Sequence, residues 1–217
     1  MKLTSVLFNV VLALAVLGLC FKLYGGDASQ NAAAVESDSP EASVAGTVYD
    51  NILSRASVRD YTDREIESAT LDSLLRAAMA APSARDQRPW HFIVVNDREI
   101  LDSLGAMAGP WAPVGRAQAA VIVCGSTVGS KPGSINEFWI EDCSAAAENL
   151  LLAAHGMGLG AVWCGGYPHE ERVASLRSDF SLPDSIQPLN VIALGYPKAQ
   201  GRVKEKFNEE RIHVNGW

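Results

Sequence analysis

Apolar residues recur at two spacings along this chain of 217 residues, and the two spacings predict helices and strands. Leu71, Leu74, Leu75 and Ala78 follow the 3.6-residue period of a helix. Short apolar segments such as AAVIVC and LNVIAL, rich in β-branched residues, are typical of buried strands. Helices are therefore predicted over residues 48–54, 71–81, 97–107, 136–155 and 170–178, strands over residues 90–95, 119–124, 161–164 and 189–194, and an extended tail after them.

The order of these elements indicates the fold class. Helices and strands mix without the strict alternation that a doubly wound sheet requires, so we expect an α+β fold with a mixed or antiparallel central sheet flanked by helices. The second half of segment 136–155 is apolar nearly all round, which is typical of a helix buried on most sides. A second subunit could supply part of that cover. We therefore expect a homodimer, with a central helix in a monomer as the alternative.

The N-terminus carries a long apolar segment. Residues 6–21 are apolar with one exception, lie between Lys2 and Lys22, and with their flanks approach the roughly 20 residues that span a bilayer. We expect residues 1–24 to be an N-terminal hydrophobic helix that serves as a signal anchor. A cleaved signal peptide is the second interpretation, and a lipoprotein the third, because the residue before Cys20 is not small.

The charges around that segment bear on localisation. Positive charge is slightly greater before the segment than after it, which favours a membrane-anchored domain outside the cytoplasm. The alternatives are a secreted or periplasmic domain after cleavage, or a domain that faces the cytoplasm. Residues 25–44, rich in Gly, Ser, Ala and acidic residues, predict a flexible tether. The globular domain is predicted over residues 45–217.

Composition and motifs narrow the function. The net charge is 18 − 25 = −7, which makes nucleic-acid binding improbable because that function needs a basic surface. The four cysteines form no C-x-x-C pair and the histidines no metal-binding motif, so we expect no metal site. No G-x-S-x-G, G-x-G-x-x-G or G-x-x-x-x-G-K-[ST] motif occurs, so hydrolase, Rossmann and P-loop interpretations lack support.

Two basic rows are the first candidate binding elements. Alternate residues of an extended segment point to the same side, so each row would present a line of donors that suits a phosphate. Read alone, either row is more often a solvated loop. Two such rows at opposite ends of an acidic domain could converge on one anion. The rows are Arg55-Ala56-Ser57-Val58-Arg59 and Arg202-Val203-Lys204-Glu205-Lys206.

Two loops are further candidates. The polar stretch from Pro82 to Pro89 lies between a predicted helix and a predicted strand, and it is either a solvated turn or a fitted wall for a polar, flat ligand. Gly165 and Gly166 follow another predicted strand, where paired glycines allow a ligand close to the backbone. A plain turn is the alternative there.

Taken together, these segments resemble the nitroreductase family of flavin enzymes. They occur in the family's order and extend over residues 46–210. The matching segments are the row from Arg55 to Arg59, the stretch APSARDQRPWHF from Ala81, the helix EDCSAAAENLLLAAHGMGLGAVW, Gly165-Gly166, the stretch LGYP from Leu194, and the basic tail.

The resemblance implies FMN bound at a homodimer interface, NADH or NADPH as reductant, and a two-step cycle that reduces a small acceptor such as a nitro compound or quinone. It implies phosphate contacts from Arg55 and Ser57, Arg59 near the pyrimidine edge of the flavin, and Lys204 and Lys206 as a second phosphate clamp. It also implies a flavin-lining loop of Pro82, Ser83 and Asp86, and backbone donors at Gly165 and Gly166. The flavin carries the reaction, so no catalytic side chain is assigned.

The chain departs from the family pattern at two positions. Asp86 and Arg88 stand where the family commonly has Asn and Gln, and a carboxylate can only accept hydrogen bonds. Asp86 is therefore expected either to accept from the flavin or to pair with Arg85 or Arg88. Alternative functions are a flavin-binding module without turnover, a reductive-dehalogenase-like enzyme, and a non-catalytic, membrane-tethered interaction domain.

Overall fold

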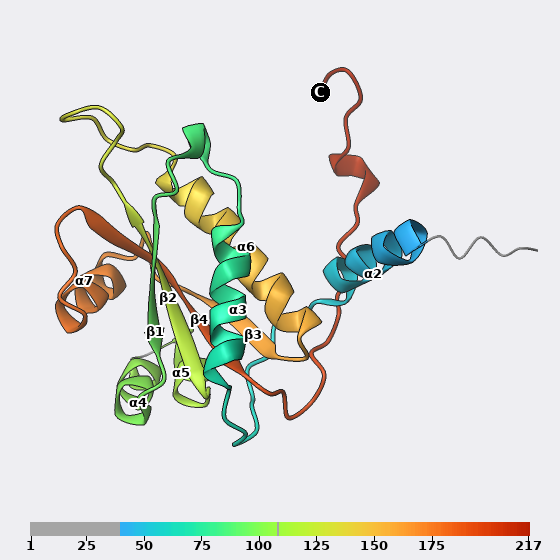
Figure 1. The fold of residues 1–217 in the computed structure, drawn as a ribbon, viewed down its shortest axis with the longest axis horizontal. Coiled ribbons are helices and arrows are strands. Elements are labelled where there is room, and N and C mark those ends of the chain that lie inside the picture. Colours follow the sequence, from blue (N-terminus) through green and yellow to red (C-terminus); the bar gives the residue numbers. More distant parts are fainter. Residues whose placement is uncertain (1–39, 108) are drawn as a thin grey trace, which may run out of the picture. The chain divides into compact units, whose positions relative to one another are not determined.

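The computed structural model describes residues 40–107 and 109–217, with side chains from Thr47 onward. Figure 1 shows its helices and strands, with longer irregular segments between α2 and α3, between β2 and α6, and in the C-terminal tail. In chain order they are α2 (Pro40–Ser54), α3 (Ser68–Met79), η1 (Ala84–Asp86), β1 (Trp90–Val95), α4 (Arg98–Ala106), α5 (Ala112–Gly115), β2 (Ala119–Ser126), α6 (Trp139–Gly156), β3 (Gly160–Gly165), α7 (Glu170–Asp179), β4 (Ile186–Gly195) and η2 (Glu209–Arg211).

The four strands form one antiparallel sheet in the order β1-β2-β4-β3. The predicted α+β class is confirmed, and of the two predicted sheet types the antiparallel one is present. A parallel bridge between Ser57 and Ala161 lies outside the named strands and adds the segment before α3 to the free edge of β3. That edge is where the first basic row meets the sheet.

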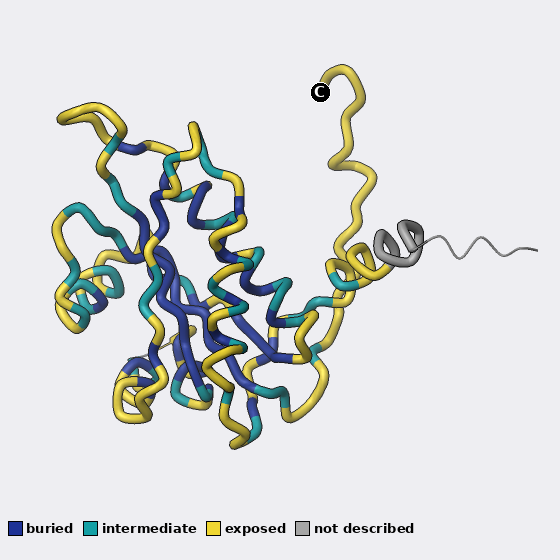
Figure 2. The backbone as a smooth tube through the Cα atoms, in the orientation of Figure 1, coloured by how far each residue is buried: buried dark blue, intermediate teal, exposed yellow. Residues whose placement is uncertain are grey.

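Both faces of the sheet are covered, which explains why β2 and β4 are apolar almost throughout. Successive strand residues point to opposite faces. In β2, Val121 and Val123 pack in a cluster with α3 and α6, whereas Ile122 and Cys124 pack with α4, α5 and α7. Figure 2 shows that burial is concentrated in the strands between these helices. The result is a layer of helices on each face of the sheet.

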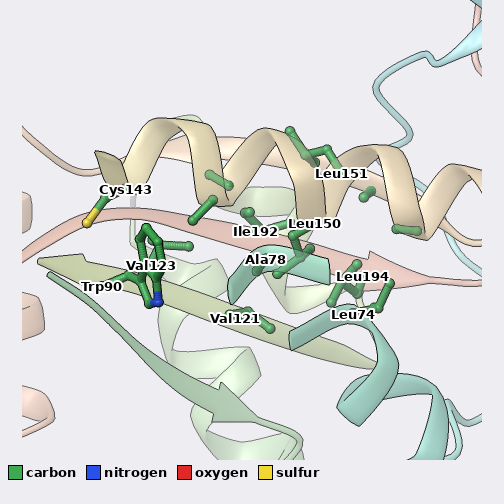
Figure 3. Packing of buried hydrophobic residues seen from close by; sticks show 14 of the residues in the cluster. Leu74, Ala78, Trp90, Val121, Val123, Cys143, Leu150, Leu151, Ile192 and Leu194 are labelled. Carbon is green, nitrogen blue, oxygen red and sulfur yellow. The ribbon is translucent and has the colours of Figure 1, made fainter. Parts of the chain in front are cut away.

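The long apolar helix α6 lies across the sheet and beside α3. Leu150 points toward Leu74 and Ala78 of α3 and toward Ile192 and Leu194 of β4, as Figure 3 shows, and Leu151 belongs to the same buried cluster. Its most buried positions are thus covered by the chain's own sheet and by α3. The apolar character of α6 is accounted for within one chain, and a dimer needs other support.

Several boundaries differ from the predicted ones, for local reasons. β4 begins at Ile186, earlier than predicted, and contains Pro188, which donates no ladder hydrogen bond. Pro188 is paired with Cys124 where the β2–β4 register shifts, and a bulge tolerates a proline. α5 and the two short 3-10 helices were not predicted, because each is too short to show a period. Residues 40–44 of the predicted tether belong to α2.

The predicted localisation, a membrane-anchored domain outside the cytoplasm, is wrong, and the membrane and signal assignments are not supported. In the described part of the chain, no helix is long and apolar enough to cross a membrane. The long helix α6 buries its apolar face in the domain and carries Glu141, Asp142 and Glu148. The apolar run at residues 6–21, on which the anchor rested, lies outside the described residues.

Candidate functional site

The two basic rows converge on one pocket. A cavity of about 280 Å³ is lined by the segment from Arg55 to Arg59 and by the start of the C-terminal tail. The charged side chains around it are Arg55, Arg59, Arg202, Lys204 and Lys206. We call this cavity the cationic pocket. Five positive side chains around one cavity, in a chain of net charge −7, indicate a site for an anion.

The first row is held against the sheet by backbone and side-chain contacts. Val58 N donates to Ala161 O at 3.0 Å, beside the bridge between Ser57 and Ala161. The buried Tyr61 hydroxyl donates to Val58 O at 2.7 Å, and burial raises the pKa of Tyr61 above its ordinary value. The segment therefore has a fixed register, and Arg55, Ser57 and Arg59 all line the cationic pocket.

A close backbone approach brings the second row to the first. A Cβ atom at Gly201 would lie 2.7 Å from Ala56 Cβ and 3.4 Å from Ser57 O. Only a residue without a side chain allows the tail this near to the first row. Arg202, Lys204 and Lys206 follow directly after this contact and line the same cavity.

The charge in the cationic pocket is only partly neutralised by the protein. Arg55 Nε lies 3.5 Å from Glu148 Oε1 of α6. Among the described residues, Arg59 and Lys204 form no ion pair. Arg116 fixes the backbone at Arg59 and Asp60. Its Nε donates to Arg59 O at 3.1 Å and lies 2.9 Å from Asp60 Oδ1. The remaining positive charge is stabilised best by a ligand with at least one full negative charge.

The second candidate loop is a tight, ordered turn. Asp86 pairs with Arg88, with Arg88 Nε to Oδ1 at 2.7 Å and Nη2 to Oδ2 at 2.6 Å. Hydrogen bonding from Arg88 holds the pKa of Asp86 below its ordinary value. Arg88 N also donates to Ser83 Oγ at 3.0 Å. Of the two expectations for Asp86, the pairing with Arg88 is the one seen.

This loop is fastened to the start of α6. The buried Asp142 accepts from Ala84 N through Oδ1 at 2.8 Å. Within the loop, Arg85, Asp86 and Arg88 all have positive φ, at 55°, 54° and 47°. Such backbone costs free energy for residues other than glycine and persists where the surroundings hold it, often at functional sites.

The glycine pair after β3 offers one open position. A Cβ at Gly165 would meet no atom within 4 Å, so a ligand can approach its backbone there. Gly166 N instead donates to Leu189 O at 3.2 Å, so it is already engaged. The Gly165 carbonyl accepts from Trp111 Nε1 at 2.9 Å, which fixes the end of β3.

The structure thus brings some predicted site residues together and leaves others apart. Arg55, Ser57, Arg59, Lys204 and Lys206 line one cavity. Pro82, Ser83 and Asp86 lie on the loop at the start of α6, and Gly165 and Gly166 lie at the far end of β3; none of these five lines the cationic pocket. Sequence reasoning missed Glu148 and Asp142, which support the two groups, because their partners Arg55 and Ala84 lie far away in the sequence.

Cysteine nucleophiles and metal sites have little support in the described part of the chain. The three cysteines there are free thiols in the core, and burial raises the pKa of Cys124 and Cys143 to about 12 and that of Cys164 to about 11. A thiol of this kind is a poor nucleophile. Among the described residues no group of His, Cys, Asp and Glu could hold a metal ion.

The fold and the cationic pocket define an α+β protein with a positively charged cavity at the edge of an antiparallel sheet. Comparison with known sequences identifies the family to which this protein belongs. The model of the Nitroreductase family matches residues 52–139 and 117–196. The chain belongs to the Nitroreductase family, and it is an oxidoreductase enzyme.

Individual relatives agree with this assignment. A protein of Methanothermobacter thermautotrophicus, provisionally named NADH dehydrogenase/NAD(P)H nitroreductase, is 46% identical over 171 residues, which are 78% of this chain and 87% of the relative. A crystal structure from Parabacteroides distasonis, provisionally named in the same way, is 47% identical with a TM-score of 0.73 and covers 78% of this chain and 98% of its own. An FMN-dependent nitroreductase from Clostridium difficile is 29% identical with a TM-score of 0.70, covering 78% and 99%.

Proposed function

We propose that this protein is an NAD(P)H-dependent flavin oxidoreductase that holds FMN through the cationic pocket and reduces a small acceptor, such as a nitro compound or a quinone. The convergence of the two basic rows on one cavity is the observation that carries the proposal. The name of the Clostridium difficile relative, an FMN-dependent nitroreductase, supports the choice of flavin.

The donors of the cationic pocket fit a phosphate monoester. Guanidinium and ammonium groups provide charge-assisted hydrogen bonds, and the Ser57 hydroxyl adds a compact donor. Arg55, Ser57, Lys204 and Lys206 would hold the phosphate of FMN. Gly165, four residues after Ala161 along β3, has open space beside its backbone and would allow close approach of the flavin ring.

The chemistry that FMN supplies when bound is acceptance of a hydride from NADH or NADPH and delivery of electrons to the acceptor. Arg59 places a positive charge beside the cavity, where it would favour a ligand that carries negative charge. Glu148 lies 3.5 Å from Arg55 Nε and would help to orient this guanidinium toward the phosphate. The protein therefore acts by binding, orientation and electrostatics.

We further propose that two copies of the chain form the working enzyme. Large apolar side chains are exposed on α2, among them Ile52 at 49%, and on the tail, among them Phe207 at 69% and Trp217 at 104%. Figure 2 shows the tail exposed along its length. A second copy would cover these residues. Within one chain, Pro82, Ser83 and Asp86 do not line the cationic pocket. In a dimer, the second copy could place its own loop of these residues beside that pocket.

The visible spectrum of the purified protein tests the proposal. A yellow protein whose flavin absorbance bleaches with NADH or NADPH, and recovers with a nitroaromatic acceptor, is the expected result. A protein that binds no added FMN contradicts the proposed cofactor. Bound FMN that no nicotinamide reduces would instead indicate a flavin-binding module without turnover.

A matched pair of lysine variants tests the cationic pocket. Lys204→Gln should weaken FMN binding about tenfold, because a charge-assisted hydrogen bond is lost. Lys198→Gln removes the same charge from the tail outside this cavity and should leave FMN binding unchanged. Quenching of FMN fluorescence on titration measures both. Equal effects would show that net charge, and not this cavity, governs binding.

A further inference from the structure

A second polar cavity lies beside the loop that carries Pro82, Ser83 and Asp86. Its volume is about 140 Å³, and its walls come from that loop and from the connection between β2 and α6. The walls include Arg85 and Gln87 on one side and Lys131, Asn136 and Glu137 on the other. We call it the loop pocket.

The loop pocket carries positive charge that the protein does not neutralise by ion pairs. Arg85 and Lys131 form no ion pair with any described residue, whereas the neighbouring Arg88 is bound by both oxygens of Asp86. Glu137 is the acidic residue in the lining, so two cations face one anion. A ligand with an oxyanion would complete the balance.

A buried donor adds to this picture. Asn136 is 3% exposed, and its Nδ2 has no hydrogen-bond partner within the described chain. Its Oδ1 accepts from Phe138 N at 3.1 Å, which fixes the orientation of the amide. A buried donor without an acceptor costs free energy. A ligand oxygen in the adjoining cavity could remove that cost.

Both walls of the loop pocket are ordered. Asp142 anchors the first wall through Ala84 N, and the positive φ of Arg85 sets its direction. The second wall is a turn closed by the bridge between Val128 and Ile135. Ser134 Oγ donates to Lys131 O at 2.8 Å within that turn. The two cations are thus presented from fixed backbone.

We propose that the loop pocket binds an oxyanion, a carboxylate or a phosphate, of a substrate that reacts at the flavin. The inference rests on the proposed function, since the substrate would react at the proposed flavin. The turn that carries Asp86 of the expected flavin-lining loop also carries Arg85 of the loop pocket, so the two sites would be neighbours. The oxyanion belongs either to an acidic acceptor or to the extra phosphate that distinguishes NADPH from NADH. In both cases the pocket selects a charged substrate over its neutral or less charged analogue.

Binding without turnover provides the first test. 4-Nitrobenzoate and 4-nitrobenzyl alcohol are titrated by calorimetry into the full chain and into Lys131→Gln and Arg85→Asn variants. Asparagine is used at position 85 because it tolerates positive φ. Each variant should weaken 4-nitrobenzoate binding about tenfold relative to the alcohol. Lys198→Gln, the same change at a lysine that lines neither pocket, should not alter that ratio.

Steady-state kinetics of the holoenzyme separate the two sources of the oxyanion. A rise in the ratio of KM for 4-nitrobenzoate to KM for the alcohol in Lys131→Gln assigns the pocket to the acceptor. A rise in the ratio of KM for NADPH to KM for NADH assigns it to the reductant, and either supports the inference. The inference is overturned, and the proposed function stands, if the variants keep bound FMN and the wild-type values of both KM ratios and of the calorimetric binding ratio. If FMN does not bind, the proposed function fails and calorimetry alone decides the inference.

Discussion

Tyr61 connects the core of the domain to the first basic row. Its ring is buried at 2% exposure, and its hydroxyl donates to Val58 O within the row itself. Arg116 acts similarly from outside, through Arg59 O and the Asp60 carboxylate. At the scale of single residues, the candidate site is therefore positioned by groups that do not line the cationic pocket.

The hydroxyl of Tyr61 should contribute measurably to stability. Tyr61→Phe leaves the buried Val58 carbonyl without this donor, and we expect the free energy of unfolding to fall by about 1–2 kcal/mol. Urea denaturation followed by circular dichroism measures the change. Tyr49→Phe, at a ring that is 62% exposed on α2, is the control and should be neutral. Equal stability of the two variants would contradict this role for the hydroxyl.

At the scale of elements, contacts between segments distant in sequence assemble the two candidate regions. The tail meets the first basic row at Gly201 and Ala56, and the loop after α3 meets the start of α6 at Ala84 and Asp142. Each junction contains a contact that a single substitution can change. Substitutions there should alter the site without removing any of its charged groups.

Gly201→Ala tests the first junction. The added methyl would lie 2.7 Å from Ala56 Cβ, so the tail must move away from the first row. We expect about a tenfold loss of FMN affinity, comparable with the loss of one charged contact, although every cation is retained. Gly216→Ala, where a Cβ meets no atom within 4 Å, is the control. Unchanged FMN affinity in Gly201→Ala would show that the tail reaches the ligand without this contact.

Asp142→Ala tests the second junction. It leaves Ala84 N without its acceptor, and we expect a loss of about 1–3 kcal/mol in the free energy of unfolding, with faster hydrogen exchange in the loop after α3. Glu141→Ala removes a neighbouring exposed acid from the same helical turn, so it reproduces the change in helix-end charge. Identical behaviour of the two variants would exclude a special role for Asp142.

At the scale of the whole molecule, the domain buries both faces of its sheet and leaves apolar side chains on α2 and on the tail exposed. The buried cysteine thiols are expected to make stability depend on pH. The exposed apolar side chains are expected to promote association of two copies.

The proposed dimer is tested on α2. Ile52→Asp should shift the protein from dimer to monomer at micromolar concentration, because a charge would be buried in the interface without a partner. Ile100→Asp is a matched control on α4, since Ile100 is 43% exposed and Ile52 is 49% exposed. Sedimentation velocity measures the mass of each. A wild-type protein that sediments as a monomer would contradict the proposed dimer.

The buried thiols predict loss of stability in alkali. Burial raises the pKa of Cys124 and Cys143 from 9.0 to about 12, so between these pH values the unfolded chain releases protons that the folded chain retains. Their stabilising contribution is complete below pH 9 and is lost as the pH rises toward 12, by about 1.4 kcal/mol per pH unit for each thiol. Urea denaturation from pH 8 to 11 measures the slope. Cys143→Ala should lower the slope of the free energy of unfolding against pH by the contribution of one thiol. An unchanged slope would contradict a raised pKa for Cys143.

Much of this protein could be predicted from local patterns. The apolar periods locate α3, α4, α6, α7 and all four strands, because spacing and β-branching act within each segment. The alternation of Arg55, Ser57 and Arg59 predicts candidate donors that lie together, and all three line the cationic pocket. The boundaries of β2 and β4, and the proline inside β4, depend on strand pairing and were missed.

The tertiary structure decided which of these segments meet. Contacts between distant segments placed Lys204 and Arg55 around one cavity, joined Asp142 to the loop after α3, and opened a second cavity between Arg85 and Lys131. They also showed that the chain's own sheet and α3 cover the apolar face of α6. Periodicity and charge are properties of neighbouring residues, so the sequence alone established the elements and the candidate donors. Convergence depends on how remote elements pack, and that packing is set by the whole core at once.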